Sequence, residues 1–319
     1  MSQTPLEPLA TDAPLLSFVI PVYNDRGEVA HTVAALAAQK AASPFEVILV
    51  DDGSEPPLAS HYSPPQGQPV FLLRLDKNQG RSGAINAGVA RSAARYIALL
   101  DADCVPQPGF VDNLMQRLLH GERLVFGHIA FRADDAYFDR YENLVQLKRS
   151  RDLQNWDTSL TSANVALQRE LFLAVDGFSS EYRHYGFEDR DFFIRLRSTY
   201  PDLRPLYLHE CTVVHVDRPE LAGMLDKFFR SGKHTAAVFR QRHPEAYQRM
   251  GQRYFDAALY PAYRVIPRRV MSALAAAGIG IVRQLFAVAR HAGWYPAADN
   301  ALKLMKGLAY LRGTLEQEP

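Results

Sequence analysis

The chain has 319 residues, of which 47% are hydrophobic and 22% are charged, as in ordinary globular proteins. A net charge of +1 gives no general case for nucleic-acid binding, so we expect no nucleic-acid partner. The two cysteines, Cys104 and Cys211, exclude a framework of several disulfides and suit a reducing compartment.

Residues 1–15 are polar and proline-rich, which predicts a disordered or extended N-terminus that is not a signal peptide. After them, short apolar runs that fit buried strands alternate with Ala- and Leu-rich stretches that fit helices. The expected strands are Ser17–Val22, Phe45–Val50, Val70–Leu75 and Tyr96–Leu100, and the expected helices are Glu28–Gln39 and Ser82–Ala94, with Asn24 or Asp25 as the cap of the first. This order predicts a mainly parallel sheet, whose ligands bind beyond the carboxyl ends of the strands.

The middle of the chain, Ala136–Ser198, is predicted to be mostly helical, with a connecting stretch near Trp156–Ala163. Arg204–Leu208 and Thr212–Val216 are two further candidate strands. From Leu221 onward the pattern is helical, amphipathic and basic. We therefore expect three parts, which are the N-terminus over 1–15, an α/β domain over 16–220 and a helical region over 221–319.

An acidic pair, Asp51 and Asp52, follows the second expected strand and precedes Gly53. A carboxylate at that place can accept a hydrogen bond from a nucleobase, and the glycine allows a tight turn. The alternative is an Asp-Gly turn that only caps the next element.

A second acidic motif, Asp101-Ala102-Asp103, ends the fourth expected strand. Carboxylates two residues apart on extended chain point to the same side, where they can bind Mg²⁺ or Mn²⁺ and bridge the ion to a diphosphate. His215 lies in a later apolar run and is either a further ligand of such an ion or a structural histidine. The alternative for the aspartates is a solvated strand end.

A third acidic motif, Glu188-Asp189-Arg190-Asp191, precedes an apolar helical pattern. One of its carboxylates can act as the general base that deprotonates an acceptor hydroxyl group. The alternative is that these acids only stabilise the helix by interacting with its dipole.

Together these motifs resemble family 2 glycosyltransferases. The resemblance rests on Ser17–Asn24, Val50–Ser54, Asn78–Gly80 with Ala84, Asn86 and Gly88, and Leu100–Asp103, and it continues through Thr161–Ala166, Asp176–Phe178 and the Glu188-Asp189 pair. The second stretch is also similar to the C-terminal half of galactosyltransferase-like enzymes. The resemblance as a whole covers about two thirds of the chain and ends near Arg218. It implies the GT-A fold and an inverting reaction.

The resemblance also implies roles at the donor. Pro21 to Tyr23 should line the uracil and ribose pocket, while Asp52 binds the base and Asp51 supports it. Arg81 should contact the nucleotide or its diphosphate. The implied cofactor is Mn²⁺ or Mg²⁺, which Asp103 should hold directly and His215 as a further ligand, while Asp101 reaches the ribose or a metal-bound water.

For the reacting sugars, the resemblance implies that Asp189 is the catalytic base and that Glu188 contacts the acceptor or the donor sugar. Asn164 is implied as another sugar contact. The loop Tyr182–Phe187 lacks the Trp-Gly-Gly of galactosyltransferase-like relatives, so the donor sugar cannot be transferred from them. The Gln-x-x-Arg-Trp segment of processive synthases is also missing, which favours non-processive transfer.

The C-terminal region has a different character. Residues 221–319 hold fifteen Lys or Arg and six Asp or Glu, a net charge of about +9, against about −8 for residues 1–220. Its longest apolar run, Val270–Val282, is shorter than the ~20 residues of a membrane span, so we expect no spanning helix. The basic amphipathic helices are expected to lie on an anionic membrane; alternatively, they cover the catalytic domain or form a homodimer contact.

The sequence thus predicts a cytoplasmic, metal-dependent, inverting glycosyltransferase that works at the inner face of the cell membrane. It would move a sugar from a nucleotide-sugar, a UDP-sugar by the resemblance, to a hydroxyl group of a glycan or lipid-linked acceptor. One alternative is a catalytically silent protein that binds sugar nucleotides or glycans. Another is a nucleotidyltransferase, which would need a glycine-rich basic loop that Pro21–Arg26 does not offer.

Overall fold

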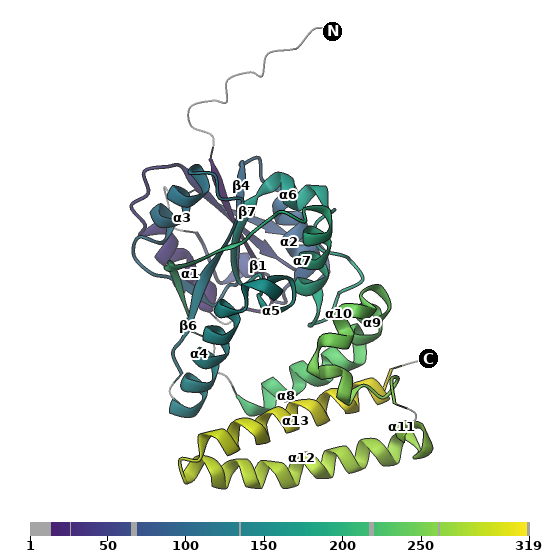
Figure 1. Cartoon of the computed structure of the whole chain (residues 1–319). Coiled ribbons are helices and arrows are strands. Elements are labelled where there is room, and N and C mark those ends of the chain that lie inside the picture. Colours follow the sequence, from purple (N-terminus) through teal and green to yellow (C-terminus); the bar gives the residue numbers. More distant parts are fainter. Residues whose placement is uncertain are drawn as a thin grey trace, which may run out of the picture.

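The computed structural model describes residues 14–25, 27–64, 69–133, 135–216, 220–260 and 262–317. The disordered or extended N-terminus expected over 1–15 lies outside the described residues except for its last two. Figure 1 shows an upper part with a twisted sheet and helices on both sides, and a lower layer of long helices.

One eight-stranded sheet forms the centre of the upper part, in the order β3-β2-β1-β4-β7-β6-β8-β5. Its strands are β1 (Leu16–Val22), β2 (Phe45–Asp51), β3 (Val70–Arg74), β4 (Tyr96–Leu100), β5 (Cys104–Pro106), β6 (Leu124–Phe131), β7 (Asn164–Gln168) and β8 (Leu206–His215). The first four strands pair in parallel, as do β6 and β8, whereas β7 and β5 run antiparallel to their neighbours. The mainly parallel α/β sheet expected from the sequence is therefore confirmed.

Alternating strand residues build a core on each face of the sheet. In β1, Phe18 and Ile20 pack with α1 (Glu28–Ala37) and α3 (Phe110–Leu119), whereas Val19 packs on the other face. That second face is covered by α2 (Gly80–Arg91), α5 (Trp156–Ser159), α6 (Arg169–Ala174) and α7 (Glu188–Thr199). Helices on both faces of a mostly parallel sheet leave the strand ends accessible.

Several elements differ from the sequence-based expectation. The strands β5, β6 and β7 were not expected, and the two strands expected over 204–216 form the single strand β8. The pairing of β6 with β8 shifts register between Gly127 and His128, because Gly127 pairs with Leu208 and His128 pairs with Thr212. The expected cap Asp25 accepts hydrogen bonds from the backbone N–H groups of Gly27 and Val29 at the start of α1.

The expected helical region follows β8. Its helices are α8 (Leu221–Arg230), a π-helical turn over Ser231–Thr235, α9 (Ala236–Arg242), α10 (Pro244–Arg249), α11 (Ala262–Val265), α12 (Arg268–His291) and α13 (Tyr295–Leu315). α12 and α13 lie side by side below α8 and form the layer farthest from the sheet (Figure 1). Close packing joins this layer to α8, because a Cβ at Gly313 would lie 2.1 Å from the carbonyl oxygen of Phe229.

The expectation that no segment could span a membrane needs correction. The helix α12 continues beyond the apolar run Val270–Val282 to His291, which makes it 24 residues long. By length and composition it is apolar enough to cross a membrane, and only 11% of its most apolar 18-residue window is buried. A continuous helix that includes the flanking residues reaches a length that the run alone does not.

Candidate active site

The ends of β1, β2 and β4 bring the first two acidic motifs to one place. Pro21 is in register with Val50, and the backbone N–H of Asp52 donates to the carbonyl oxygen of Val22 at 2.8 Å. β1 also pairs with β4, which Asp101 directly follows. We call the residues that end these strands, Pro21–Tyr23, Asp51–Gly53 and Asp101–Asp103, the carboxyl edge. Tyr23 is 55% exposed there and can stack on a ligand.

The neighbouring carboxylates Asp51 and Asp52 lie in different environments. Asp51 is buried, accepts the N–H groups of Ser54 at 2.9 Å and Leu58 at 3.0 Å, and forms an ion pair with Arg74 at 2.5 Å. Burial alone would raise the pKa of Asp51, but these hydrogen bonds lower it overall. Asp51 therefore holds the turn that precedes Leu58.

Asp52 faces the segment that begins α2. It accepts the backbone N–H of Gln79 at 2.7 Å, and burial raises its pKa above the ordinary value. Gly53 follows with φ +70°, and a Cβ there would lie 2.7 Å from the backbone nitrogen of Asn78. Only glycine permits this approach, which packs the two motifs around Asp52 and Asn78 together.

Arg81 connects the carboxyl edge to the third acidic motif. Its guanidinium lies 2.7 Å from Asp101 and 3.3 Å from Asp189, and it donates to Ser162 at 2.8 Å. The Ser162 hydroxyl also donates to Asp189. Burial would lower the pKa of Arg81, but the carboxylates of Asp101 and Asp189 raise it overall. One cation thus gathers carboxylates that are 88 residues apart in the sequence.

The acidic pair begins α7. Phe187 before it has φ +68°, and Glu188 accepts the backbone N–H of Gly186 at 2.7 Å. Glu188 is 7% exposed, and burial together with the adjacent charge of Asp189 raises its pKa to about 7. Glu188 can therefore gain or lose a proton near neutral pH.

Asp191, two residues further on, points away from this site. It is fully buried and interacts with Arg195 of the same helix and with His243, both at 2.8 Å. Burial would raise the pKa of Asp191, but the hydrogen bonds from His243 and Arg195 lower it overall. Its position makes Asp191 a structural link between α7 and the C-terminal region.

Asp103 and His215 form the candidate metal centre. The Nε2 atom of His215 lies 3.4 Å from a carboxylate oxygen of Asp103, and the ligand atoms of these residues and of Cys104 all lie within 4.8 Å of one another. The pairing of β5 with β8 places Cys104 opposite His215, and Phe131 of β6 stacks on the imidazole at 4.8 Å.

The donor set fits Mn²⁺ or Mg²⁺ through its oxygen and nitrogen atoms. Burial, Asp103 and Asp101 raise the pKa of the Cys104 thiol, so it stays protonated and is a poor ligand. Asp101, expected to reach the ribose or a metal-bound water, forms an ion pair with Arg81 at 2.7 Å. The structure therefore brings two of the three expected ligands together.

Asn164, expected to contact a sugar, has another partner set. It is buried in β7, and its amide nitrogen donates to the carbonyl oxygens of His128 and Cys211, both at 3.1 Å. Its amide nitrogen therefore ties β7 to β6 and β8 rather than facing a ligand. Ser162, two residues earlier, reaches Arg81 and Asp189 but was not singled out. Its position in the Thr161–Ala166 motif is the signal that could have found it.

The chain is similar to known proteins of one kind. Residues 17–176 match the family described as glycosyl transferase family 2. Glycosyltransferase AglE of Haloferax volcanii is 25% identical over 240 residues, which are 72% of this chain and 76% of that protein. The undecaprenyl-phosphate 4-deoxy-4-formamido-L-arabinose transferase of Pseudomonas aeruginosa is 28% identical over 54% of this chain and 47% of its own length. The dodecaprenyl-phosphate galacturonate synthase of Rhizobium johnstonii is 32% identical over 36% of this chain and 37% of its own length.

Among solved structures, a mannosyltransferase from Pyrobaculum calidifontis in complex with GDP-Man and Mn²⁺ is similar with a TM-score of 0.54. The alignment covers 92% of this chain and 86% of that chain. Coverage this high must include most of the C-terminal helices. At 17% sequence identity, this likeness concerns the fold.

Proposed function

Because the chain belongs to glycosyl transferase family 2 and is a glycosyltransferase, we propose that it moves a sugar from a UDP-sugar to a hydroxyl group of a glycan or lipid-linked acceptor, with inversion and with bound Mn²⁺ or Mg²⁺. Its architecture is the GT-A fold followed by C-terminal helices. The observation that carries the proposal is the bridge from Asp101 through Arg81 to Asp189, since it joins the carboxyl edge to the candidate base.

In this proposal the carboxyl edge holds the donor nucleotide. Asp52 accepts a hydrogen bond from the base, while Pro21 and Tyr23 line the base and ribose. The buried position of Asp52, fixed by the N–H of Gln79, supports this role. Which base is bound is open to test, because the solved relative is in complex with GDP-Man.

Asp103 and His215 would hold the divalent ion. An ion bound there would neutralise negative charge that develops on the departing diphosphate. Arg81 is the residue of this chain that can take a second share of that charge, because its guanidinium already lies between carboxylates at the edge. When the diphosphate attracts Arg81, the ion pair with Asp189 weakens and that carboxylate becomes available as a base.

Asp189 then accepts the proton of the acceptor hydroxyl group. The acceptor oxygen forms a bond to the anomeric carbon from the side opposite the diphosphate, and the bond from that carbon to the phosphate oxygen breaks. The configuration inverts, the nucleoside diphosphate leaves with the bonding electrons, and the proton stays on Asp189. Ser162 orients the base through its hydrogen bond, and the adjacent Glu188 is proposed to contact a sugar.

The acceptor is proposed to be linked to a membrane lipid. Two relatives are named as transferring sugars to undecaprenyl phosphate or making dodecaprenyl-phosphate galacturonate. In this chain, α12 has a line of exposed apolar side chains that we call the apolar stripe. It consists of Val270, Leu274, Ile281, Leu285 and Val288, which are 48–67% exposed. Their spacing of three, four and seven residues puts them on one face.

This stripe supports contact with a membrane surface at the inner face of the cell membrane. α12 packs along α13 on another face, so it lies on the surface of the bilayer rather than crossing it. Arg268 and Arg283 on the same helix favour anionic lipids.

A turnover assay tests the proposed activity. The protein is incubated with single sugar nucleotides and Mn²⁺, and the released nucleoside diphosphate is measured with and without lipid-linked acceptor. We expect diphosphate release that increases with acceptor. A nucleotidyltransferase would instead release pyrophosphate, and a silent binding protein would bind the nucleotide without releasing any product. Either result would refute the proposed function.

A further inference from the structure

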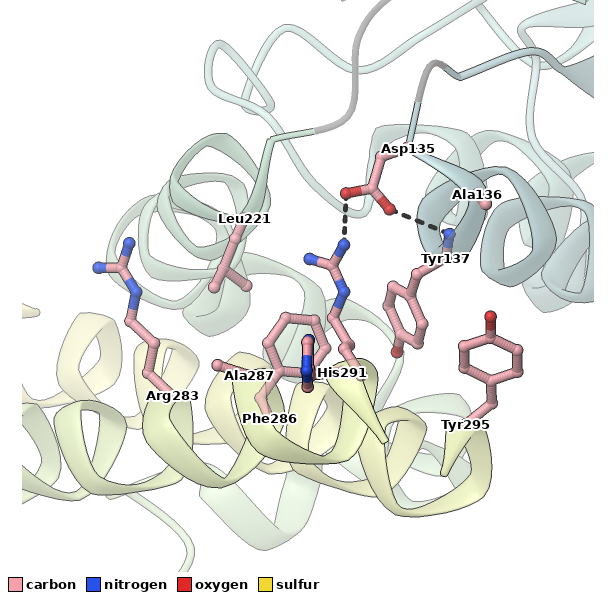
Figure 2. A pocket seen from close by; sticks show the side chains of 10 residues that line it. Asp135, Ala136, Tyr137, Leu221, Arg283, Phe286, Ala287, His291 and Tyr295 are labelled. Carbon is pink, nitrogen blue, oxygen red and sulfur yellow. Dashed lines mark hydrogen bonds and ion pairs between the residues drawn. The ribbon is translucent and has the colours of Figure 1, made fainter. Parts of the chain in front are cut away.

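A cavity of about 640 Å³ lies between the start of α4 (Ala136–Arg151) and the last third of α12. Figure 2 shows Arg283 and Leu221 at one end of the cavity and Tyr137 and Tyr295 at the other. Phe286 and Ala287 form part of its floor on α12. The cavity belongs to none of the motifs that the proposed reaction uses.

The polar lining of this cavity is cationic. Arg290 forms an ion pair with Asp135 and lies 5.1 Å from the ring centre of Tyr137, yet its buried Nε atom has no hydrogen-bond partner among the described residues. For Arg283, the described part of the chain offers no ion pair and no hydrogen bond. Among the described residues that line the cavity, Asp135 is the only carboxylate beside two arginines, so this lining carries a net positive charge.

The apolar lining lies beside these cations. Leu221, Phe286 and the two tyrosine rings offer surface for hydrocarbon, whereas Arg283 and Arg290 offer N–H donors that suit phosphate. A ligand that satisfies both parts is amphiphilic, with an anionic phosphate next to an apolar chain. A sugar nucleotide would leave the apolar part uncovered.

The position of the cavity on α12 agrees with such a ligand. Arg283, Phe286, Ala287, Arg290 and His291 follow the i, i+3, i+4, i+7, i+8 pattern of one helix face. At ~100° per residue this face is roughly half a turn from the apolar stripe. A helix whose apolar face lies ~5–10 Å deep in the interface holds its opposite face at the level of the lipid head groups. The cavity therefore opens where lipid phosphates are found.

The cavity is also within reach of the active site. Phe131, which stacks on His215 of the candidate metal centre, is four residues from Asp135 in the cavity wall. Four residues span at most roughly 14 Å. A saccharide on a lipid phosphate held in the cavity can cover that distance.

From these observations we infer that the cavity between α4 and α12 binds the phosphate head group of a membrane lipid, with Arg283 and Arg290 on the phosphate and Tyr137, Tyr295, Phe286 and Leu221 along the first carbons of the chain. In the context of the proposed function, which this inference rests on, that lipid phosphate belongs to the acceptor. Anionic phospholipid offers the same chemistry and is the second source to be distinguished.

Calorimetric titration of the full chain with soluble probes tests this site. Farnesyl phosphate represents the acceptor lipid, dihexanoyl phosphatidylglycerol represents phospholipid, and inorganic phosphate and farnesol each carry one half of the chemistry. We expect farnesyl phosphate to bind more tightly than inorganic phosphate or farnesol. Arg283→Gln should weaken its binding by ~10-fold or more, as expected for a lost charge-assisted hydrogen bond. Ala287→Trp, which fills the cavity and keeps its charges, should weaken it as well.

Arg269→Gln is the matched control, because it removes the same charge from an exposed position on α12 outside the cavity. It should leave farnesyl phosphate binding unchanged, and melting temperatures will show that all three variants fold. Tighter binding of farnesyl phosphate than of phosphatidylglycerol supports the acceptor as the source, and the reverse order supports phospholipid. Unchanged binding in both Arg283→Gln and Ala287→Trp, or equal affinity for inorganic and farnesyl phosphate, overturns the inference.

Binding of UDP in Mn²⁺ is measured on the same proteins. If UDP binds and the cavity variants bind farnesyl phosphate as tightly as the wild type, the inference alone is refuted. If farnesyl phosphate binds in the cavity and neither UDP nor any other nucleotide binds, the proposed donor site is refuted and the lipid site stands.

Discussion

Arg81 decides how the candidate base behaves before a donor arrives. Its charge is shared between Asp101 and Asp189, and Ser162 donates to the same carboxylate of Asp189. In the proposed mechanism, a base held in this way is unreactive until Arg81 has another anion to bind. This coupling would protect the donor from attack by water before the complex is complete, because the same residue would contact the diphosphate and release the base.

Replacing Asp189 with Asn tests its role as the base. The amide keeps the shape and can accept a hydrogen bond from Ser162, but it cannot take a proton. Loss of a general base lowers rates by ~10²–10⁴. We expect a fall in that range in single-turnover transfer at saturating substrates, with nucleotide affinity largely intact.

Near-normal turnover of Asp189→Asn would refute this assignment. Glu188→Gln is the neighbouring comparison and should affect turnover less and sugar or acceptor affinity more. Asp191→Asn is not a neutral control, since Asp191 is buried between Arg195 and His243. Breaking that network should lower the melting temperature before it affects the chemistry.

The raised pKa of Glu188 leads to a prediction about stability. Its pKa is about 7, against an ordinary value of 4.5, so between these values the folded protein holds a proton that the unfolded chain has lost. The free energy of unfolding therefore falls as the pH rises through this window. Glu188→Gln removes the buried charge, so it should stabilise the protein at about pH 8 by at most roughly 3 kcal/mol and have little effect below about pH 4.5. Urea unfolding at both pH values measures this, and a gain that does not depend on pH would contradict it.

At the scale of elements, the start of α7 depends on the C-terminal helices. The Phe187 ring stacks on Phe239 of α9 at 4.6 Å, and a Cβ at Gly186 would lie 2.3 Å from the Ser231 hydroxyl. Thr235 also donates to the carbonyl oxygen of Tyr185. Residues of the C-terminal helices, more than 40 positions later in the sequence, therefore fix the conformation of the loop that precedes Glu188.

Phe239→Ala should loosen this loop. Phe239 is fully buried, and such a truncation costs about 3–5 kcal/mol of stability. Turnover should fall together with the melting temperature, while UDP affinity at the carboxyl edge changes less. Phe71→Ala, at a ring that is 43% exposed on β3, is the comparison variant, which should lower the melting temperature less and leave turnover unchanged. Retention of full turnover in Phe239→Ala would show that the C-terminal helices do not position α7.

The sequence was sufficient where the determining interactions are local. The first four strands alternate with helices, and the acidic motifs follow strands directly, so the carboxyl edge could be predicted before the fold was known. The sequence was not sufficient for β6 and β7, because strands far away in the sequence determine their pairing. Leu167 of β7, for example, pairs with Ile97 of β4 and with Leu124 of β6. The partners of the Asn164 amide nitrogen were not predicted for the same reason, since they are carbonyl groups on two other strands.

For the whole molecule, the charge asymmetry and the apolar stripe favour one orientation of the protein on a membrane surface. The acidic α/β domain lies on one side of the helical layer (Figure 1). The residues of the apolar stripe on α12 are exposed, although α12 packs along α13. With the stripe on a membrane, the active site stays in the aqueous phase beside it. Its acceptor would then arrive from the lipid side and its nucleotide-sugar from solution.

Co-sedimentation with vesicles tests this orientation. The protein should bind vesicles with anionic lipid, bind neutral vesicles less, and dissociate as salt screens the charges. Ile281→Ser combined with Leu285→Ser should weaken binding, while the paired change Ala273→Ser and Ala277→Ser, at exposed alanines of α12, removes little apolar surface and should not. If the full chain ignores anionic vesicles at low salt and is a dimer in solution, the stripe is a homodimer contact instead.

The central claim is that the carboxyl edge and the Asp103–His215 pair form a metal-dependent nucleotide site. The most direct test is UDP affinity by calorimetry, with and without Mn²⁺, for the wild type and Asp103→Ala. We expect Mn²⁺ to strengthen UDP binding to the wild type. Asp103→Ala should remove at least ~10-fold of the affinity measured in Mn²⁺, since even groups that only orient a metal ligand contribute that much. Its metal-free affinity should stay nearly unchanged. Equal losses with and without Mn²⁺, or wild-type binding that ignores the metal, would contradict the claim.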